Sequence, residues 1–280
     1  MTTAEAVPAR PAALDPPYDY PGYHSTRLRA PKMQLRPIPP GLADKGGPVF
    51  GDGLLAREDH DLTLGHPGEP VGQRIIVTGR LRDSAGRPVR RQLVEIWQAN
   101  AAGRYRHDLD RHPAPLDPNF TGVGRCLTDD DGNYRFVTVH PGAYPWKNHD
   151  NAWRPAHIHF SVFGTSFVER LVTQMYFPGD PLLVMDPIYQ SIADRRAAEL
   201  LVARFDMATT VESWALGYVF DIVLGGAVPT PVDGGNERSW PPRGAVPGVV
   251  APPTHAVSDR RAVREPGYGV VGRRRHCGRN

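Results

Sequence analysis

The chain has 280 residues, and its 30 prolines and 29 glycines, about a fifth of the total, favour a loop-rich all-β sandwich or barrel. Residues 229–280 hold nine arginines, no lysine and four acidic residues, a net charge of +5, so residues 1–228 carry −2 of the total of +3. The basic balance therefore comes from the C-terminal segment and gives no general case for nucleic-acid binding by the folded part.

The N-terminal part is predicted to be irregular, and regular structure is predicted to follow it. Residues 1–70 are rich in proline and lack periodicity, so we expect an extended N-terminal arm. The next segments are predicted as a strand over 74–81, a glycine-bearing turn over 83–88 and a second strand over 93–97. We expect these two strands to pair as a hairpin.

A long loop follows over residues 99–121, and it carries Tyr105. Loops of this length inside a compact domain are often functional. After it, the acidic segment Asp129–Gly132 resembles half of a calcium loop but lacks the later ligands, including a glutamate at the twelfth position. We therefore expect a hairpin turn there, leading into a strand over 134–139.

The segment Ala156–Val162 alternates apolar residues with His157 and His159. In a strand, side chains two positions apart lie on one face, so these two imidazoles could chelate one metal ion without distorting the backbone. The same spacing also occurs in histidines that only fill a surface or core position. The pattern therefore predicts a strand and offers a candidate metal site.

The remainder of the domain is predicted to contain a strand over 167–177, one short helix over 194–205 and a final strand over 214–224. The expected sandwich domain then covers residues 71–228, with mostly antiparallel strands and long loops around the site. Residues 229–280 lose periodicity and become rich in proline, glycine and arginine, which predicts a disordered tail.

The two cysteines, Cys126 and Cys277, are too few for a disulfide framework, which favours a reducing compartment. Residues 1–18 lack the apolar segment of a signal peptide, and no run approaches the eighteen apolar residues of a membrane span. We therefore expect a cytoplasmic protein without a membrane partner.

Two tyrosines, Tyr105 and Tyr144, are candidates to complete a metal site with the histidines. Neutral imidazole nitrogens and phenolate oxygens make a mixed, fairly hard donor set, which suits ferric iron better than zinc. Tyrosines also fill half-buried positions for packing alone. The spacing in the sequence does not establish that these tyrosines approach the histidines in space.

Four motifs resemble, in order and spacing, those of the intradiol ring-cleavage dioxygenases. They are Leu93-Val94-Glu95-Ile96-Trp97-Gln98-Ala99-Asn100, Gly103-Arg104-Tyr105-Arg106-His107, Asp117-Pro118-Asn119-Phe120 and Arg154-Pro155-Ala156-His157-Ile158-His159-Phe160. The resemblance extends from Tyr23 to Gly225. Within the family, the chain is most similar to beta subunits of the members that cleave 3,4-dihydroxybenzoate.

The resemblance implies a non-haem Fe(III) site with four ligands: Tyr105, Tyr144, His157 and His159. It implies that Tyr144 and His157 are axial, and that Tyr144 leaves the iron and acts as a catalytic base when a catechol binds. It assigns Arg154 to the stabilisation of charge that develops on the bound substrate. Pocket-lining positions are implied at Tyr23, Trp97, Trp146 and Gln174.

The resemblance also implies a function and a partner. A homologous alpha subunit would complete the site, the arm before Gln73 would pack across the interface, and O2 would open the ring to 3-carboxy-cis,cis-muconate in aromatic catabolism. One alternative is an intradiol enzyme for catechol or hydroxyquinol, but such relatives usually carry an N-terminal helical dimerisation domain. Another is a non-catalytic β-sandwich binding module, which would be expected to lose the iron ligands.

Overall fold

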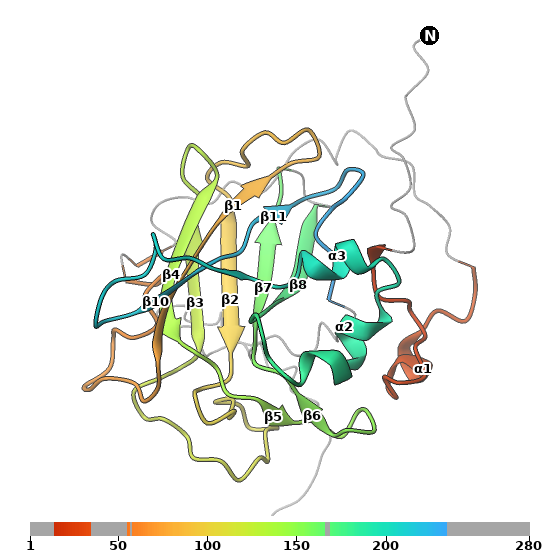
Figure 1. The fold of residues 1–280 in the computed structure, drawn as a ribbon, viewed down its shortest axis with the longest axis horizontal. Coiled ribbons are helices and arrows are strands. Elements are labelled where there is room, and N and C mark those ends of the chain that lie inside the picture. The colour runs from red at the N-terminus through yellow and green to blue at the C-terminus, as the bar shows by residue number, and fades with distance from the viewer. Residues whose placement is uncertain (1–13, 35–54, 57, 166–168, 234–280) are drawn as a thin grey trace, which may run out of the picture.

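The computed structural model describes residues 14–34, 55–56, 58–165 and 169–233, and two β-sheets form its centre (Figure 1). One sheet has the order β11-β1-β10-β9, with β4 on the other side of β1, and the second has the order β3-β2-β7-β8. The strands are β1 (Arg74–Arg82), β2 (Leu93–Gln98), β3 (Val123–Leu127), β4 (Asn133–Val139), β5 (Tyr144–Pro145), β6 (Trp153–Arg154), β7 (His157–Phe163), β8 (Arg170–Tyr176), β9 (Arg204–Phe205), β10 (Leu216–Val219) and β11 (Ile222–Val223). The helices are α1 (Thr26–Arg29), α2 (Pro187–Ser191), α3 (Arg195–Glu199) and a 3-10 turn at Leu183–Met185.

The two sheets bury a shared hydrophobic core, which confirms the predicted β-sandwich. Alternation places Val94 and Ile96 of β2 and Phe160 of β7 on the inner face of the second sheet. Ile75 of β1 and Phe136 of β4 contribute to the same core from the first sheet. All five side chains are fully buried. The apolar alternation of these strands is therefore explained by one layer of packing between two sheets.

The opposite face of the β3-β2-β7-β8 sheet, called here the outer face, carries polar and aromatic side chains. The strand register places Trp97 opposite His159, and His159 opposite Gln174. Glu95, two residues before Trp97, lies opposite Ser161, which is two residues after His159. Because side chains on one face repeat every two residues, these two cross-strand rows are neighbours on one surface.

The two predicted hairpins are wrong, because each predicted turn joins strands of different sheets. The turn after β1 closes with a bridge from Arg82 to Pro88, and Val89 then enters the core as the chain crosses to β2. The acidic turn closes with the Asp129 N–H donating to the Asn133 carbonyl, but it leads from β3 to β4 of the other sheet. Each strand has an apolar face that is buried by packing against a second sheet. These turns carry the chain from one sheet to the other, so that the two apolar faces can pack together.

The C-terminal elements differ from the prediction in their boundaries. The predicted helix over 194–205 ends at Glu199, because the chain continues into β9, which pairs with β10. The predicted final strand is divided into β10 and β11, which pair in parallel with successive parts of β1. Between them the Arg80 N–H donates to the Asp221 side chain, which interrupts the ladder.

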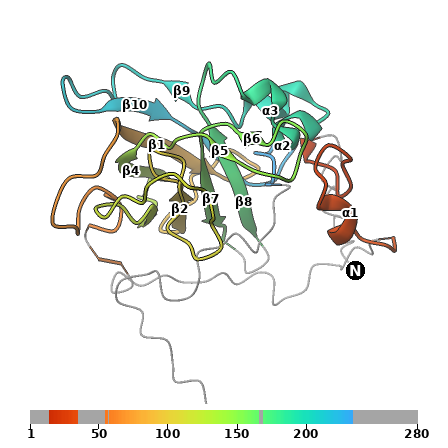
Figure 2. The ribbon, with the colours of Figure 1, turned by 90° about the horizontal axis from the view of Figure 1, so that it is seen from below.

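Helices α1 and α2 and the 3-10 turn add to the single helix that the sequence predicts. All three α-helices lie at the end of the molecule where β8 lies (Figure 1, Figure 2). In the described ranges, none of the helices has the length and apolar character to cross a membrane. The strand predicted over 167–177 begins at Arg170, and residues 166–168 lie outside the described residues.

Both ends of the described chain pack against the domain. Leu14, in the predicted arm, joins the hydrophobic cluster that α2 and α3 form with β8. At the other end, Thr230–Asp233, called here the C-terminal strap, is hydrogen-bonded to β11 and β8. The first residues of the predicted tail are therefore part of the fold, while residues 234–280 and about half of the predicted arm (1–13, 35–54 and 57) lie outside the described residues.

Candidate metal centre

Strand β7 brings the two histidines to one surface, with their Nε2 atoms 3.2 Å apart. The Nδ1 atom of His157 lies 2.7 Å from the Pro155 carbonyl oxygen, so Nδ1 carries the proton and donates it. The Nδ1 atom of His159 faces the Asp233 carboxylate at 3.4 Å, an ion-pair contact that is longer than an ordinary hydrogen bond, and Nδ1 has no hydrogen-bond partner among the described residues. The Nε2 atom of His157 is therefore unprotonated, and the Nε2 atoms of both rings face one point.

The two tyrosines come from segments outside the large sheets, and a glycine lets these segments pack closely. Tyr105 follows Gly103 in the long loop between β2 and β3, and Tyr144 begins β5. Gly103 has φ +76°, and a Cβ atom there would lie 2.1 Å from the Ala143 carbonyl oxygen. Only glycine fits this approach without pushing the tyrosine-bearing segments apart.

The tyrosine side chains meet the histidines at the same point. The Tyr144 hydroxyl lies 3.3 Å from His157 Nε2. The rings of Tyr105 and Tyr144 are in edge contact with their centroids 5.3 Å apart, and the Tyr105 ring lies 6.4 Å from that of His159. Within the part of the chain that the structure describes, the buried Tyr105 hydroxyl has no hydrogen-bond partner. The structure thus brings together all four residues that the sequence proposed as ligands.

The electrostatics of these four side chains fit a bound cation. Burial lowers the pKa of both imidazoles and raises the pKa of both phenols. The Nε2 atoms of the two rings, 3.2 Å apart, repel each other when both are unprotonated, and a buried hydroxyl without a partner is unfavourable. A cation bound by these atoms would remove both penalties, and this mixture of nitrogen and oxygen donors suits ferric iron.

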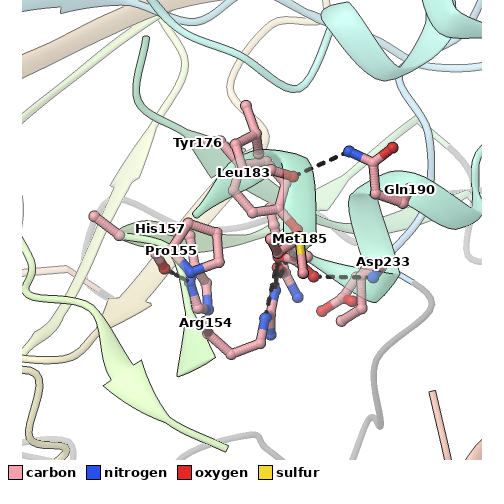
Figure 3. A network of polar contacts seen from close by, with 12 residues as sticks. Arg154, Pro155, His157, Tyr176, Leu183, Met185, Gln190 and Asp233 are labelled. Carbon is pink, nitrogen blue, oxygen red and sulfur yellow. Dashed lines mark hydrogen bonds and ion pairs between the residues drawn. The ribbon is translucent and has the colours of Figure 1, made fainter. Parts of the chain in front are cut away.

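A buried ion pair holds Arg154 beside the four donors. The register of the β5–β6 ribbon places Arg154 opposite Tyr144. Its Nε and Nη2 atoms donate to one carboxylate oxygen of Asp186, at 3.1 and 2.9 Å. Nη2 also donates to the Tyr176 hydroxyl at 3.1 Å and to Gln174 Oε1, and Figure 3 shows Arg154 and Tyr176 in this network. Asp186 is in addition the N-cap of α2, so the helix and the ion pair support each other.

Three of the four donors, Tyr105, Tyr144 and His159, line a cavity of about 540 Å³ with aromatic walls. All four residues predicted to line a pocket do so: Tyr23, Trp97, Trp146 and Gln174. Trp97 stacks on the His159 ring with centroids 4.8 Å apart, and Tyr23 meets Trp146 edge-on at 4.7 Å. The Arg154 guanidinium lies over Trp146. Flat aromatic surfaces with a few polar groups between them suit a flat aromatic ligand.

Asp233 also lines this cavity, although the sequence assigns it to a disordered tail. Its side chain is only 3% exposed. Burial by itself raises the pKa of this carboxyl, but interactions with His159 and Gln174 outweigh that effect, so the pKa lies below its ordinary value. Sequence reasoning also missed Asp186. Single aspartates beside prolines are typical of turns, so neither residue carries a local signal of its role.

Profiles of two protein families match the chain. The family described as Dioxygenase matches residues 45–226, and the family described as protocatechuate 3,4-dioxygenase beta subunit N terminal matches residues 9–41. The chain is 57% identical to the protocatechuate 3,4-dioxygenase beta chain of Burkholderia cepacia over 220 residues, which cover 78% of this chain and 93% of that protein.

More distant relatives cover less of the chain. The chlorocatechol 1,2-dioxygenase of Rhodococcus opacus is 29% identical over 152 residues, which cover 50% of this chain and 57% of that protein. Among solved structures, catechol 1,2-dioxygenase from Acinetobacter sp. ADP1 is 28% identical with a TM-score of 0.45, covering 63% of this chain and 59% of that one.

Proposed function

The chain belongs to the intradiol ring-cleavage dioxygenase family, and we propose that it is the iron-binding beta subunit of a protocatechuate 3,4-dioxygenase. Such an enzyme cleaves 3,4-dihydroxybenzoate with O2 between its two hydroxylated carbons, giving 3-carboxy-cis,cis-muconate for aromatic catabolism. The observation that carries the proposal is the convergence of two imidazoles and two phenols, three of which line an aromatic cavity.

Four side chains would hold the iron: Tyr105, Tyr144, His157 and His159. Bound Fe(III) supplies a Lewis acid and a template for the two substrate oxygens. The chain prepares its own atoms for this, because the Nδ1 hydrogen bond of His157 leaves its Nε2 atom free and a carboxylate faces Nδ1 of His159. The raised pKa of both phenols means that two protons must leave as the metal binds, so iron uptake should strengthen as the pH rises.

Tyr144 and Arg154 take the catalytic roles in this proposal. The Tyr144 oxygen lies at the donor cluster and can accept a proton from a catechol hydroxyl once it is a phenolate. Arg154, opposite Tyr144 in the β5–β6 ribbon, places a fixed positive charge at the cavity wall. That charge stabilises the negative charge that develops on the substrate ring. Trp97, Trp146 and Tyr23 orient the ring between them.

We further propose that a homologous alpha subunit covers the mouth of the cavity. The similar protein from Burkholderia cepacia is named as a beta chain, which implies a partner chain. Leu109 lines the cavity yet is 80% exposed, and an apolar side chain in that position suits contact with another protein. The packing of the predicted arm across this interface stays a prediction, as does a cytoplasmic location, which rests on the low cysteine content.

Activity on catechol or hydroxyquinol is the second candidate. Relatives that act on catechols match only about half of this chain, whereas the beta chain matches 78% of it, which favours 3,4-dihydroxybenzoate. The retention of all four candidate ligands weighs against a non-catalytic binding module.

The deciding experiment uses the full-length chain co-expressed with an alpha subunit. We expect one ferric iron per chain, a visible phenolate-to-iron absorption band, and faster O2 uptake with 3,4-dihydroxybenzoate than with catechol. A preference for catechol would favour the second candidate. A colourless protein that binds no iron would leave only the binding module.

A further inference from the structure

The C-terminal strap occupies part of the free edge of β8, the last strand of the second sheet. The Asp233 N–H donates to the Val172 carbonyl at 2.6 Å. The Thr173 hydroxyl donates to the Pro231 carbonyl at 2.7 Å. An edge strand has unpaired backbone groups, and the strap bonds to one of them, the Val172 carbonyl, as well as to the Thr173 side chain. The position of the Asp233 backbone is therefore set by β8.

Two further contacts hold the strap from its other sides. Thr230 exchanges hydrogen bonds with the Val223 backbone, its N–H donating to the carbonyl at 3.0 Å and its hydroxyl accepting the N–H at 2.9 Å. The Val232 N–H donates to the Asp15 carboxylate at 2.9 Å. Thr230 is 1% exposed. The strap is thus tied to β11, to β8 and to the N-terminal segment.

The side chain of Asp233 connects two parts of the candidate metal centre. One carboxylate oxygen lies 3.4 Å from His159 Nδ1. Gln174 uses its amide oxygen to accept from Arg154 and from the Tyr176 hydroxyl, so its amide nitrogen is left to donate to Asp233. A continuous series of polar contacts therefore runs from the guanidinium through Gln174 and Asp233 to the His159 ring.

The two histidines are oriented by different acceptors. His157 Nδ1 donates to the Pro155 carbonyl, which comes from the segment that begins β7 itself. His159 Nδ1 faces a carboxylate that is distant in sequence and delivered by the strap. A carboxylate is the stronger acceptor, and contacts of this kind fix the tautomer and orientation of a ligating imidazole.

We propose that Asp233 is a positioning residue that keeps the proton of His159 on Nδ1, so that Nε2 faces the metal. The inference rests on the proposed iron site. It gives the strap a role at the metal site, whereas the sequence predicted no such role for any of residues 229–280. The affinity for iron then depends on the strap as well as on the strand and loops that carry the ligands.

The test compares Asp233→Leu and Asp233→Asn in the full-length chain. Leucine removes the acceptor at similar volume, and asparagine keeps a neutral one. We expect iron release to a chelator to accelerate on the order of 10- to 100-fold in Asp233→Leu, with Asp233→Asn between it and wild type. Asp15→Ala is the matched control, because it removes a tether of the strap but leaves the carboxylate in place.

A second measurement needs no iron. Nitrogen-15 spectra of histidine-labelled, metal-free protein should show His159 in the Nδ1–H tautomer in wild type, and in a mixture of tautomers in Asp233→Leu. If the leucine variant folds poorly, the His159 tautomer in Asp233→Asn still tests whether Asp233 positions the proton. Wild-type iron release and tautomer in both Asp233 variants would overturn the inference, as would equal acceleration in Asp15→Ala while its His159 keeps the wild-type tautomer. A wild-type chain that takes up no ferric iron would instead refute the proposed function.

Discussion

Two neighbouring rows on the outer face of the β3-β2-β7-β8 sheet satisfy their buried polar groups in different ways. In the Glu95 row, Glu95 lies between Arg125 and Ser161, and Arg170 donates to the Ser161 hydroxyl at 3.2 Å. Burial is the largest influence on Glu95 and raises its pKa to about 7, while the charges of Arg170 and Arg125 oppose that rise. In this row the protein supplies its own cations.

The second row, called here the site row, contains Trp97, His159 and Gln174 on adjacent strands. Here the chain supplies candidate metal-binding atoms and not cations. Arg154, which lies beside this row, is already paired with the Asp186 carboxylate. The unprotonated nitrogens and the phenol oxygens are left facing one another. Arg154 reaches only the Gln174 amide of the site row, so the imidazole nitrogens and phenol oxygens beside it are suited to an external cation.

The largest effect expected from this comparison follows removal of a nitrogen donor. His159→Ala should reduce iron retention by about 100-fold or more, since loss of a ligand exceeds the loss of a contact behind it. Ser161→Ala removes a buried polar group from the Glu95 row of the same strand and should leave iron content unchanged. Iron per chain after gel filtration and the visible absorption band measure both. Equal iron loss in the two variants would show that the rows are not distinct.

Next in size is the contrast between two ion pairs. Asp186→Ala leaves the Arg154 charge buried and removes a helix cap, so we expect a loss of about 3–5 kcal/mol in the free energy of unfolding. Asp59→Ala breaks the pair with Arg125, whose side chains are 22% and 16% exposed, and should cost about 1 kcal/mol or less. Urea unfolding of the metal-free protein compares them. If Asp186→Ala lost less free energy of unfolding than Asp59→Ala, the role given to Asp186 would be contradicted.

Tyr144→Phe tests whether the two phenols are equivalent. If the Tyr144 phenolate accepts a substrate proton, its loss should slow binding of 3,4-dihydroxybenzoate by about 100-fold while iron and a shifted absorption band remain. Tyr105→Phe should change the colour more and substrate binding less. Anaerobic stopped-flow absorption distinguishes the variants. A wild-type binding rate in Tyr144→Phe would refute the base role.

The smallest effect belongs to the Glu95 row and appears in the pH dependence of stability. Glu95 has a pKa of about 7 when folded, above its ordinary value of 4.5, so between these pH values the folded state binds more protons. Its contribution to stability is therefore lost as the pH rises through about 7. Glu95→Gln should match wild type near pH 4 and be more stable by about 1–3 kcal/mol near pH 8. Thermal unfolding across this range measures it, and parallel pH profiles would show that Glu95 is not perturbed.

Local pattern was enough to predict the strands and the faces of their side chains. The predicted strands over 74–81, 93–97 and 134–139 match β1, β2 and β4 within one residue at each end. His157 and His159 share a face because alternation along a strand depends only on backbone geometry. The tyrosines and Arg154 were supplied by family resemblance, and the structure brings them to the same place.

Sheet membership was decided only by the tertiary structure. The strand β2 is buried on both faces, so its alternation does not reveal which strands it pairs with. A turn sequence favours chain reversal, but whether the next strand stays in the sheet or crosses the core depends on burying the apolar faces of the whole domain. The two wrong hairpins have this common cause.

The sequence by itself thus determined the class of fold, the positions of four strands and the pair of histidines, because each depends on neighbours a few residues apart. Only the tertiary structure decided that Asp186 pairs with Arg154 and that Asp233 returns to His159. Those contacts join residues that are 32 and 74 positions apart in the sequence. A single aspartate in a proline-rich segment belongs to no periodic pattern from which such a contact could be predicted. Their positions are set by the packing of α2 and of the C-terminal strap against a finished sheet.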